Sequence, residues 1–591
     1  MYLRITATFL ILTIVIACNG EAVTYEPVLD QEIPLQANGP VDPIAAASAT
    51  RGGIYTAWGG PNPKSLNVWL DPWALSGQVM DLMFESLVTM HSTRNEPVGV
   101  LAESWTSSPD NMEFTFRLRP EARWSDGQPV TAEDIQFYYD TIMNEEHLTP
   151  VARATLSRFA RPEVVDEHTV RIRSLETNWK AFWEAGGFVA FPKHIWEGQD
   201  FNRVNFEFPV VSGPYRLHDY RRNRFVVLQR RGDWWGRMLR YNLNKYNFDY
   251  LRFRFQEDRN AALETFKKGD YDVYSIYTAS IWAQQTENIE AVERGWVVRQ
   301  EIYNDEPRGF QGFAINLRRP KFQDVRVRQA LAHLLNREQM LEQLMFNQYF
   351  LLNSYFPDLY PGNQNPAVPV VAYNPRRASD LLDQAGWEVG TDGIRRKDGQ
   401  ALHINFITYA SDSRHMNIYV EDLRRAGLEV EVELLSKAEV TRRTDEFNFD
   451  LYWINTGAGR LRDPEPMFHS RYADEQASSN LAGVADARVD QLLEQLRRER
   501  NLSRRDVLLR QLDGRLMELS PYVLLWQSDR TRLLYWNRFG MPASVLDRFN
   551  REDVIPVYWF NDREKAERLA EAEQGGQELP KPPARIDFHG P

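Results

Sequence analysis

The chain has 591 residues, of which 43% are apolar and 12% aromatic, so it is long enough for two or three packing units with large cores. This composition excludes an intrinsically disordered chain, which would be poor in apolar residues. The 82 Asp and Glu outnumber the 70 Lys and Arg, and the net charge of −12 argues against a nucleic-acid partner, because binding a phosphate backbone requires a basic surface.

The N-terminus has the pattern of a signal peptide. Arg4 precedes an apolar run from Ile5 to Ile16, which at about a dozen residues is shorter than the roughly 20 that cross a membrane. Val15-Ile16-Ala17-Cys18 resembles a bacterial lipobox, in which a small residue precedes the cysteine that is acylated. Cys18 is the only cysteine, which excludes internal disulfides and a cysteine-based metal site. We expect residues 1–17 to be removed and Cys18 to carry a lipid anchor. The alternative is that Cys18 is simply an apolar residue of the signal sequence.

Two terminal segments lack sustained periodicity. Residues 18–50 contain several Pro, Gly and small residues, which predicts a flexible tether behind the lipidated N-terminus. Residues 561–591 contain a charged, helix-like stretch followed by Gly-Gly and a Pro-rich segment. We expect this end to be a surface tail.

Turn and helix-start residues mark the region that follows the tether. Asp126-Gly127 and Gly213-Pro214 are turn pairs. Thr131 followed by Glu133 and Asp134 places acids in the first turn of a predicted helix, where the helix dipole stabilises them. These residues are expected to shape the fold and not to bind a ligand.

Two helices are predicted in the middle of the chain. Residues 260–268 form the first, which Gly269 closes because glycine accepts the left-handed conformation of a helix end, and the strand-like sequence YDVYSIY follows. Asp324 is a plausible N-cap for the second helix. That helix is predicted to be long, because apolar residues recur at roughly helical spacing at Val327, Leu331, Leu334, Leu341 and Met345.

Strands and helices alternate over residues 401–455. Apolar and polar residues alternate at 402–406 and again at 428–434, a helix-like stretch ends at Gly427, and another at 436–446 leads to the strand-like 449–454. This order predicts an α/β lobe, whose ligands usually bind at the carboxyl ends of its strands. The loop after Ile454 is therefore a candidate binding site.

Five segments, in order along the chain, resemble the family 5 extracellular solute-binding proteins, the peptide, dipeptide and nickel binders of ABC importers. The resemblance spans about residues 50–540, and within the family it is closest to the branch that binds microcin C and peptidoglycan-derived peptides. The segments are VGVLAESWTSSPDNMEFTFRLRPEARWSDGQPVTAEDIQFYYDTI at 98–142, VSGPYRL at 211, LETFKKGDYDVY at 263, FAINLRRPKFQDVRVRQALAHLLNREQM at 313 and YNPRRASDLLDQAGW at 373.

The resemblance implies an α/β, two-lobed periplasmic-binding-protein-like fold with an inserted subdomain in the first lobe. The chain is expected to cross between the lobes near residues 278 and 520. The implied divisions are 51–85, 211–278 and 521–560 for lobe one, 86–210 for the inserted subdomain and 279–520 for lobe two.

The implied function is that of a substrate-binding lipoprotein of an ABC importer, not an enzyme. It would capture an oligopeptide or a peptide-like ligand, such as a peptidoglycan-derived peptide or a peptide-nucleotide, between its lobes and deliver it to the permease subunits. The expected location is the periplasmic space or the outer face of the cell envelope, with membrane contact only through the lipid. A monomer without cofactor, metal or nucleic acid is expected.

The loop at 455–464 carries the first group of candidate contacts. Dipeptide and oligopeptide binders of the family hold the ligand's amino group with an early acid in the corresponding loop, and that acid is missing here. Arg460 and Arg462 make the loop basic instead, and guanidinium groups match carboxylates and phosphates. We therefore expect the ligand to present an anionic group there. The alternative is that both arginines are solvated, and Asp463-Pro464 is expected to be structural.

The second group of candidates consists of aromatic and amide side chains. Tryptophan and tyrosine offer large apolar faces together with a polar N–H or O–H, although each could equally be a core residue. An asparagine in FAINLRRP could offer both a donor and an acceptor. The candidates are Tyr55, Trp58, Trp453, Trp526, Asn316 and Asn455.

Three alternatives remain open. The 17 Trp would also suit stacking on an oligosaccharide. A chelated metal is less favoured because His403, His415 and His469 show no ligand spacing. A periplasmic hydrolase lacks support because the sequence has no HExxH, GxSxG or P-loop motif, although a triad assembled only in space stays open.

Overall fold

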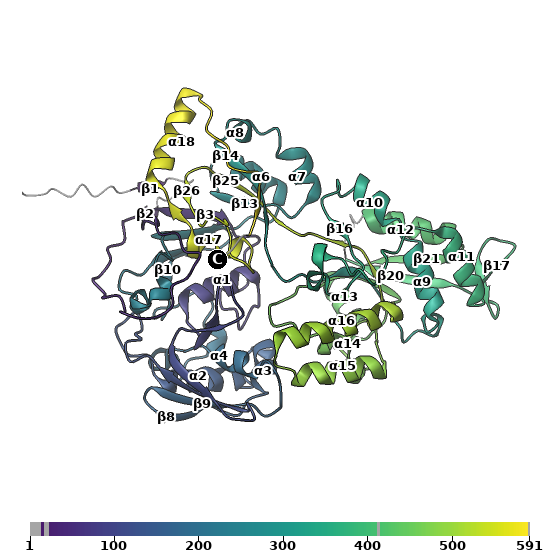
Figure 1. The fold of residues 1–591 in the computed structure, drawn as a ribbon, viewed down its shortest axis with the longest axis horizontal. Coiled ribbons are helices and arrows are strands. Elements are labelled where there is room, and N and C mark those ends of the chain that lie inside the picture. The colour runs from purple at the N-terminus through teal and green to yellow at the C-terminus, as the bar shows by residue number, and fades with distance from the viewer. Residues whose placement is uncertain (1–13, 17–22, 410–413, 589–591) are drawn as a thin grey trace, which may run out of the picture. The chain divides into compact units, whose positions relative to one another are not determined.

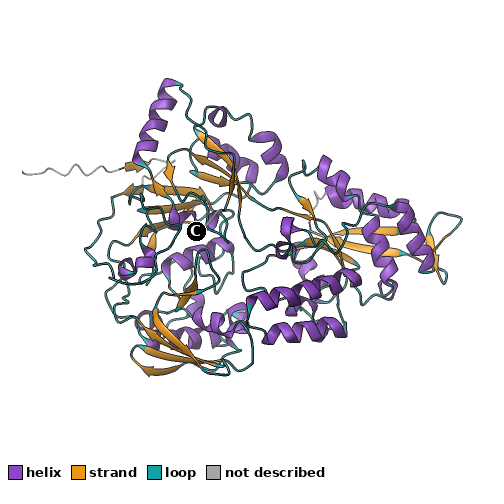
Figure 2. Cartoon of the chain, viewed as in Figure 1, coloured by secondary structure: helices purple, strands orange, loops and turns teal. Residues whose placement is uncertain are grey.

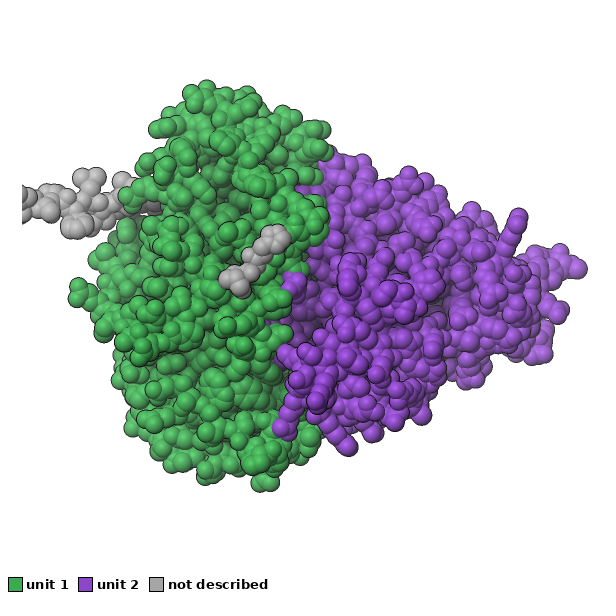
Figure 3. Space-filling model, in the orientation of Figure 1, with its two compact units in different colours: residues 1–277, 286–304, 531–591 green, residues 278–285, 305–530 purple. Residues whose placement is uncertain are grey.

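The computed structural model describes residues 14–16, 23–409 and 414–588. The chain forms two compact units (Figure 3). Unit 1 contains residues 1–277, 286–304 and 531–591, and unit 2 contains residues 278–285 and 305–530. The chain passes between the units after residues 277, 285, 304 and 530, whereas crossings were predicted near 278 and 520. Residues 297–303 form a strand of the unit 1 sheet, and residues 522–524 form a strand of the unit 2 sheet.

Unit 1 is built on an eight-stranded sheet with the order β10-β11-β12-β3-β13-β25-β14-β28 (Figure 1). The neighbours β12, β3 and β13 are parallel, whereas β25 is antiparallel to both β13 and β14. The strands are β3 (Ile54–Trp58), β10 (Tyr215–Arg221), β11 (Phe225–Arg230), β12 (Tyr250–Arg254), β13 (Val273–Ser275), β14 (Val297–Tyr303), β25 (Thr531–Trp536) and β28 (Arg585–Asp587).

The central strands of unit 1 are buried along their length. Every residue of β25 is buried, as are five of the six residues of β11, which is the pattern of strands covered on both faces. The helices α1 (Ala74–Met83) and α6 (Arg259–Lys267) contribute buried residues to this unit. The predicted helix at 260–268 is α6, which begins where the Asp258 carboxylate accepts a hydrogen bond from the Ala261 N–H at 2.7 Å.

A smaller sheet within residues 86–210 has the order β6-β7-β9-β8. Its strands are among those drawn in orange in Figure 2. The helix predicted after Thr131 is α2 (Ala132–Met143), where Thr131 and Asp134 form a reciprocal capping box. The Trp124 indole also donates to Asp134 at 3.3 Å, so these residues do shape the fold. The strands are β6 (Ala102–Ser107), β7 (Glu113–Leu118), β8 (Glu163–Asp166) and β9 (Thr169–Arg173).

Unit 2 contains a five-stranded sheet with the order β21-β20-β22-β15-β23. The strands β21, β20 and β22 are parallel, and β15 runs antiparallel to β22 and β23. The predicted alternation over 401–455 is confirmed, since strands and helices follow one another in that order. The elements are β15 (Gln311–Ile315), β20 (His403–Thr408), α12 (Arg414–Arg425), β21 (Glu429–Leu434), α13 (Lys437–Asp445), β22 (Leu451–Asn455) and β23 (Tyr522–Leu524).

The long helix predicted after Asp324 is two helices in the structure. Asp324 caps α9 (Val325–His333) through a hydrogen bond from the Arg326 N–H at 2.9 Å, as predicted. The Asn336 side chain then caps a separate helix, α10 (Arg337–Gln343). Because the helical spacing of apolar residues continues across the break between α9 and α10, the sequence pattern did not reveal this break.

Residues 26–50, here called the N-terminal strap, lie on unit 1 and differ from the flexible tether expected. Buried Arg230 donates to Asp30 at 2.5 Å and to Asp249 at 2.7 Å. Lys245 pairs with Asp42 at 2.5 Å, and neither side chain is more than 5% exposed. Because buried charges require such partners, these ion pairs hold the strap on the unit.

The C-terminal segment also differs from the surface tail expected. The helix α18 (Arg563–Gly575) begins at the Asp562 cap, and β28 adds a parallel strand beside β14. The Trp296 indole donates to the Gln577 carbonyl at 2.7 Å. The tail prediction failed because these partners lie more than 280 residues earlier in the chain.

Candidate ligand-binding surfaces

The carboxyl ends of three parallel strands define one edge of the unit 2 sheet. The strands β20, β21 and β22 end there at Thr408, Leu434 and Asn455. Asn455 is exposed and lies opposite Gln311 in the ladder. This edge is where ligands bind in open α/β sheets, so it is the first candidate surface.

Aromatic side chains gather at this edge. Trp453 is half-buried, and its indole N–H is enclosed but has no hydrogen-bond partner among the described residues. Trp526 is buried, and its ring meets the His415 ring edge-on at 5.7 Å. Burial lowers the pKa of His415, so its imidazole is neutral at pH 7. This edge therefore combines packed aromatic rings with an enclosed donor that has no partner among the described residues.

The loop after β22 is fixed at its start by close backbone packing. The Thr456 N–H donates to the Phe310 carbonyl at 2.9 Å, and the Phe310 N–H donates to the Thr456 hydroxyl at 2.9 Å. A Cβ at Gly309 would lie 1.9 Å from the Thr456 carbonyl oxygen, so only glycine fits there. The loop leaves the sheet from a defined position.

The two arginines of this loop are half-buried. Arg462 donates to both carboxylate oxygens of Asp358, at 2.7 and 2.8 Å, and its guanidinium lies 5.3 Å from the Phe356 ring centroid. Its charge is therefore already paired within unit 2. Arg460 belongs to the same loop and also has partners of its own. Asp463 accepts a hydrogen bond from the Glu465 N–H at 3.2 Å, which fits a structural role.

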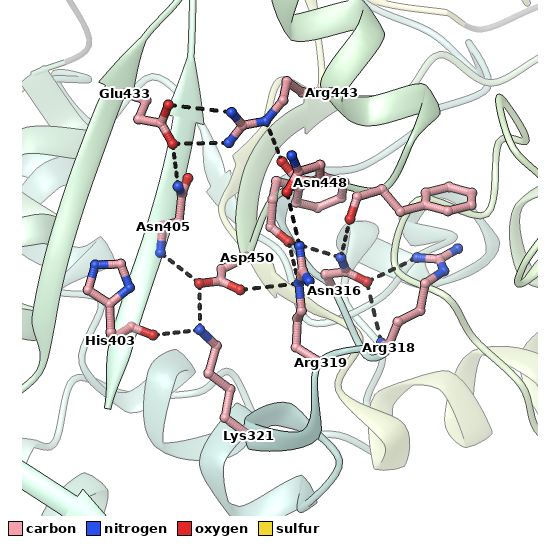
Figure 4. A network of polar contacts seen from close by, with 12 residues as sticks. Asn316, Arg318, Arg319, Lys321, His403, Asn405, Glu433, Arg443, Asn448 and Asp450 are labelled. Atoms are coloured by element: carbon pink, nitrogen blue, oxygen red, sulfur yellow. Dashed lines mark hydrogen bonds and ion pairs between the residues drawn. The ribbon is translucent and has the colours of Figure 1, made fainter. Parts of the chain in front are cut away.

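Asn316 lies at the opposite edge of the sheet, among the amino ends of β20 and β22 (Figure 4). It is fully buried, and its amide donates to the Phe447 and Phe449 carbonyls at 2.8 and 2.9 Å. Its side-chain oxygen accepts from the Arg318 guanidinium at 3.1 Å. Both halves of the amide are thus engaged within the chain.

The same edge contains a buried carboxylate at the centre of a polar network (Figure 4). Asp450 accepts from the Lys321 ammonium at 2.6 Å and from the Asn405 N–H at 2.7 Å. Glu433 extends the network through Asn405 and through Arg443 at 3.0 Å. These bonds link the start of β22 to the middle of β20 and, through Glu433, to the carboxyl-terminal part of β21.

In unit 1, Tyr55 and Trp58 lie on β3 but have different surroundings. Tyr55 is buried and stacks on Phe248 at 5.4 Å, and burial raises the pKa of its hydroxyl well above the usual value. Trp58 is half-buried at the carboxyl end of the strand, and its indole donates to the Gln256 carbonyl at 2.7 Å. Trp58 therefore lies at an edge, whereas Tyr55 is a core residue.

Around Trp58 the structure brings together residues that the sequence did not single out. The Arg259 guanidinium lies 5.8 Å from the Trp58 ring centroid and 5.4 Å from that of Tyr277. The Tyr277 hydroxyl contacts Glu552, whose pKa burial raises to about 7. The strand-like YDVYSIY, which ends at Tyr277, was the available signal, because its last residue follows the carboxyl end of β13.

A cavity of about 610 Å³ lies in the inserted region. Its lining includes Asp140, which pairs with Arg161 at 2.6 Å, and His147, which bonds to the Thr141 carbonyl at 2.6 Å. The lining comes entirely from residues 137–202, none of which belongs to the eight-stranded sheet of unit 1. We do not assign a ligand to it.

Residues 14–16, 23–409 and 414–588 contain neither a membrane-spanning helix nor a metal-binding cluster. No helix there is long and apolar enough to span a membrane. No group of three or more His, Cys, Asp or Glu side chains there is placed to hold a metal ion.

The family model described as "Bacterial extracellular solute-binding proteins, family 5 Middle" matches residues 96–479. The chain belongs to this family. The family recognised from the sequence segments is thus confirmed.

Relatives of this family 5 protein extend beyond the matched region. The "Probable peptide-binding protein YejA" of Agrobacterium fabrum is 28% identical over 516 residues, covering 79% of this chain and 83% of that protein. The "Peptidoglycan-binding protein YepA" of the same organism is 25% identical over 494 residues, covering 75% and 79%. These two names agree with the predicted branch of the family.

A solved structure shows the fold of this family 5 protein. The oligopeptide-binding protein AppA from Bacillus subtilis, in complex with a nonapeptide, matches with a TM-score of 0.68 and 18% identity. The match covers 87% of this chain and 100% of that chain. The predicted α/β, two-lobed fold with its inserted subdomain is confirmed.

Proposed function

We propose that this family 5 protein binds an oligopeptide or a peptide-like ligand and delivers it to the permease subunits of an ABC importer. The observation that carries the proposal is the carboxyl edge of the unit 2 sheet. It combines the aromatic rings of Trp453 and Trp526 with the exposed Asn455 amide. The similarity to a protein named as probably peptide-binding supports the same ligand class.

A peptide suits this surface on chemical grounds. Each residue of a peptide offers one N–H and one C=O at a regular spacing, and binding proteins satisfy these groups with β-type hydrogen bonds. Aromatic faces accept varied side chains at low entropic cost. The Trp453 N–H is enclosed and has no partner among the described residues, so a peptide carbonyl would pair with it once the side chains around it move aside.

The ligand is proposed to carry anionic groups, such as those of a peptidoglycan-derived peptide or a peptide-nucleotide. Arg460 stays a candidate contact in the loop after β22. Arg462 is a weaker candidate, because a ligand anion would have to compete with Asp358. If the Arg462→Ala variant binds the ligand with an affinity within threefold of wild type, that result would agree with the Arg462–Asp358 pairing.

The test is mass spectrometry of small molecules released from protein purified under native conditions. Peptides or peptide-containing molecules in the released material would support the proposal. Release of an oligosaccharide would favour that alternative instead. Conversion of added peptides or esters would argue for a hydrolase, since we expect binding without turnover.

The protein is also proposed to be lipid-anchored at the outer face of the cell envelope. Cys18 lies outside the described residues, so the support is the sequence alone: the apolar run and the Val-Ile-Ala-Cys ending. Cys18→Ser should move the protein from the membrane fraction to the soluble fraction. Equal fractionation of both forms would contradict the anchor.

Delivery to a permease and a monomeric state remain to be measured. Deleting the gene should abolish uptake of the peptide identified by mass spectrometry, and a plasmid copy should restore it. Light scattering coupled to size exclusion should give the mass of one mature chain. A stable dimer would contradict the expected monomer.

A further inference from the structure

The guanidinium of Arg259 is held in place without an ionic partner. It makes no hydrogen bond or ion pair with any described residue, yet it lies against two aromatic rings, those of Trp58 and Tyr277. Both distances are within the roughly 6 Å at which a cation is attracted to a ring face. Contacts through the ring faces leave the N–H groups of the guanidinium available to an anion.

The surroundings of Arg259 are themselves fixed. The Trp58 indole donates to the Gln256 carbonyl at 2.7 Å, and the Tyr277 hydroxyl contacts Glu552. The Tyr274 hydroxyl donates to the Arg259 carbonyl at 2.7 Å. The arginine is therefore preorganised, which reduces the entropy lost when it binds a partner.

The position of Arg259 is one where α/β proteins bind ligands. It follows β12 and lies beside the carboxyl end of β3, two of the three parallel strands of the unit 1 sheet. Arg259 is also the first residue of the nine-residue helix α6, whose amino end adds partial positive charge. Tyr277 is 41% exposed, so the surface is open to a ligand.

We propose that Arg259, between Trp58 and Tyr277, binds a carboxylate of the peptide-like ligand. The inference rests on the proposed function and names one chemical group that the ligand must carry. A guanidinium pairs with a carboxylate through two parallel hydrogen bonds, which a lysine cannot reproduce. Arg462, one of the two arginines predicted to bind an anion, already has Asp358 as its partner.

The experiment compares two pools of peptides. A tryptic digest of casein is divided, the carboxylates of one half are converted to methyl esters, and each half is incubated with the full-length protein. Mass spectrometry quantifies the captured peptides. Wild type should capture the esterified pool about 10-fold less than the untreated pool, because a charge-assisted bond is lost.

The variants assign that preference to Arg259. Arg259→Ala should reduce capture of the untreated pool about 10-fold and remove the difference between pools, and Arg259→Lys should fall in between. The thermal unfolding midpoints of both Arg259 variants should equal that of wild type, because the Arg259 side chain is exposed. The matched control is Arg222→Ala, an exposed arginine in the turn between β10 and β11, which should behave like wild type.

Two results would overturn the inference, and they are distinguishable. If Arg259→Ala keeps the wild-type preference for free carboxylates, the arginine is not the contact, while peptide binding stands. If wild type captures no peptide from either pool, the proposed peptide ligand is wrong and the inference fails with it.

Discussion

The two ends of the five-stranded sheet in unit 2 differ in how completely their polar groups are paired. At the amino ends, Asp450 and Asn316 use their donors and acceptors within the chain. At the carboxyl ends, the Trp453 N–H has no partner among the described residues and Asn455 is exposed. Buried polar groups are normally satisfied. The amino ends therefore hold a completed structural network, here called the amino-end network, whereas at the carboxyl ends a ligand can supply the missing hydrogen bonds.

The strongest test of the amino-end network is the removal of its central carboxylate, that of Asp450. Asp450→Ala leaves the Asn405 N–H without its acceptor and the Lys321 ammonium with the His403 carbonyl but no anion, and should lower the free energy of unfolding by about 3 kcal/mol. Urea unfolding measures the change. Glu475→Ala, an exposed acid of the same unit, is the control and should stay within about 0.5 kcal/mol of wild type.

Asn316, a predicted ligand contact, tests whether such a residue belongs to the amino-end network instead. Asn316→Ala removes the donors to two buried carbonyls and should lower the free energy of unfolding by about 2 kcal/mol. Asn448→Ala, an exposed member of the same network, should change it by less than about 0.5 kcal/mol. Unchanged stability combined with weaker peptide capture would instead make Asn316 a ligand contact.

Trp453 tests the opposite end. Trp453→Phe keeps one six-membered aromatic ring and removes the unpartnered N–H together with the five-membered ring that contains it. Capture of the casein peptides should fall about 5-fold, which corresponds to one hydrogen bond of roughly 1 kcal/mol. Urea unfolding should change little. Lower stability with unaltered capture would show that the indole is only a packing residue.

The smallest effect is expected from pH at Glu433, where the polar network reaches the carboxyl-terminal part of β21. The hydrogen bond from Asn405, together with Arg443, holds the pKa of Glu433 below its ordinary value. The unfolded chain then binds more protons in acid, so the stabilisation is present above the ordinary pKa and is lost as pH falls through the lowered one. Because Glu433 is 27% exposed, the contribution should stay below about 1 kcal/mol.

Glu433→Gln provides the comparison for that measurement. The difference in unfolding free energy between wild type and Glu433→Gln should shrink as pH falls from about 6 to about 3. A difference that grows in acid would contradict the sign of the pKa shift.

Local patterns predicted the parts of the fold that depend on near neighbours. The alternation at 402–406 and 428–434 gave two strands of unit 2, and the caps at Thr131 and Asp324 gave helix starts. The break at Asn336 escaped because apolar spacing continues across it. Each correct prediction needed only a few consecutive residues.

The candidate site depended on distant pairings that no window of sequence contains. Asp358, the partner of Arg462, lies 104 residues earlier in the chain, and the carbonyls that engage Asn316 lie over 130 residues later. Arg259 gained its setting because Trp58, the last residue of β3, and Tyr277, which follows β13, both lie beside it. The sequence therefore indicated a candidate sheet edge, but not which of its side chains are already paired within the chain.

The N-terminal strap sets the reach of an anchored protein. A free segment from Cys18 to residue 51, where the tether was predicted to end, could extend about 110 Å, at 3.3–3.6 Å per residue. The Tyr250 hydroxyl, however, donates to the Glu26 carbonyl, and Asp30 and Asp42 continue the attachment. From Cys18 to Tyr25 the chain can extend only about 25 Å. A lipid at Cys18 would therefore confine unit 1 to a thin layer at the membrane surface, where the effective concentration for a membrane-bound permease is higher.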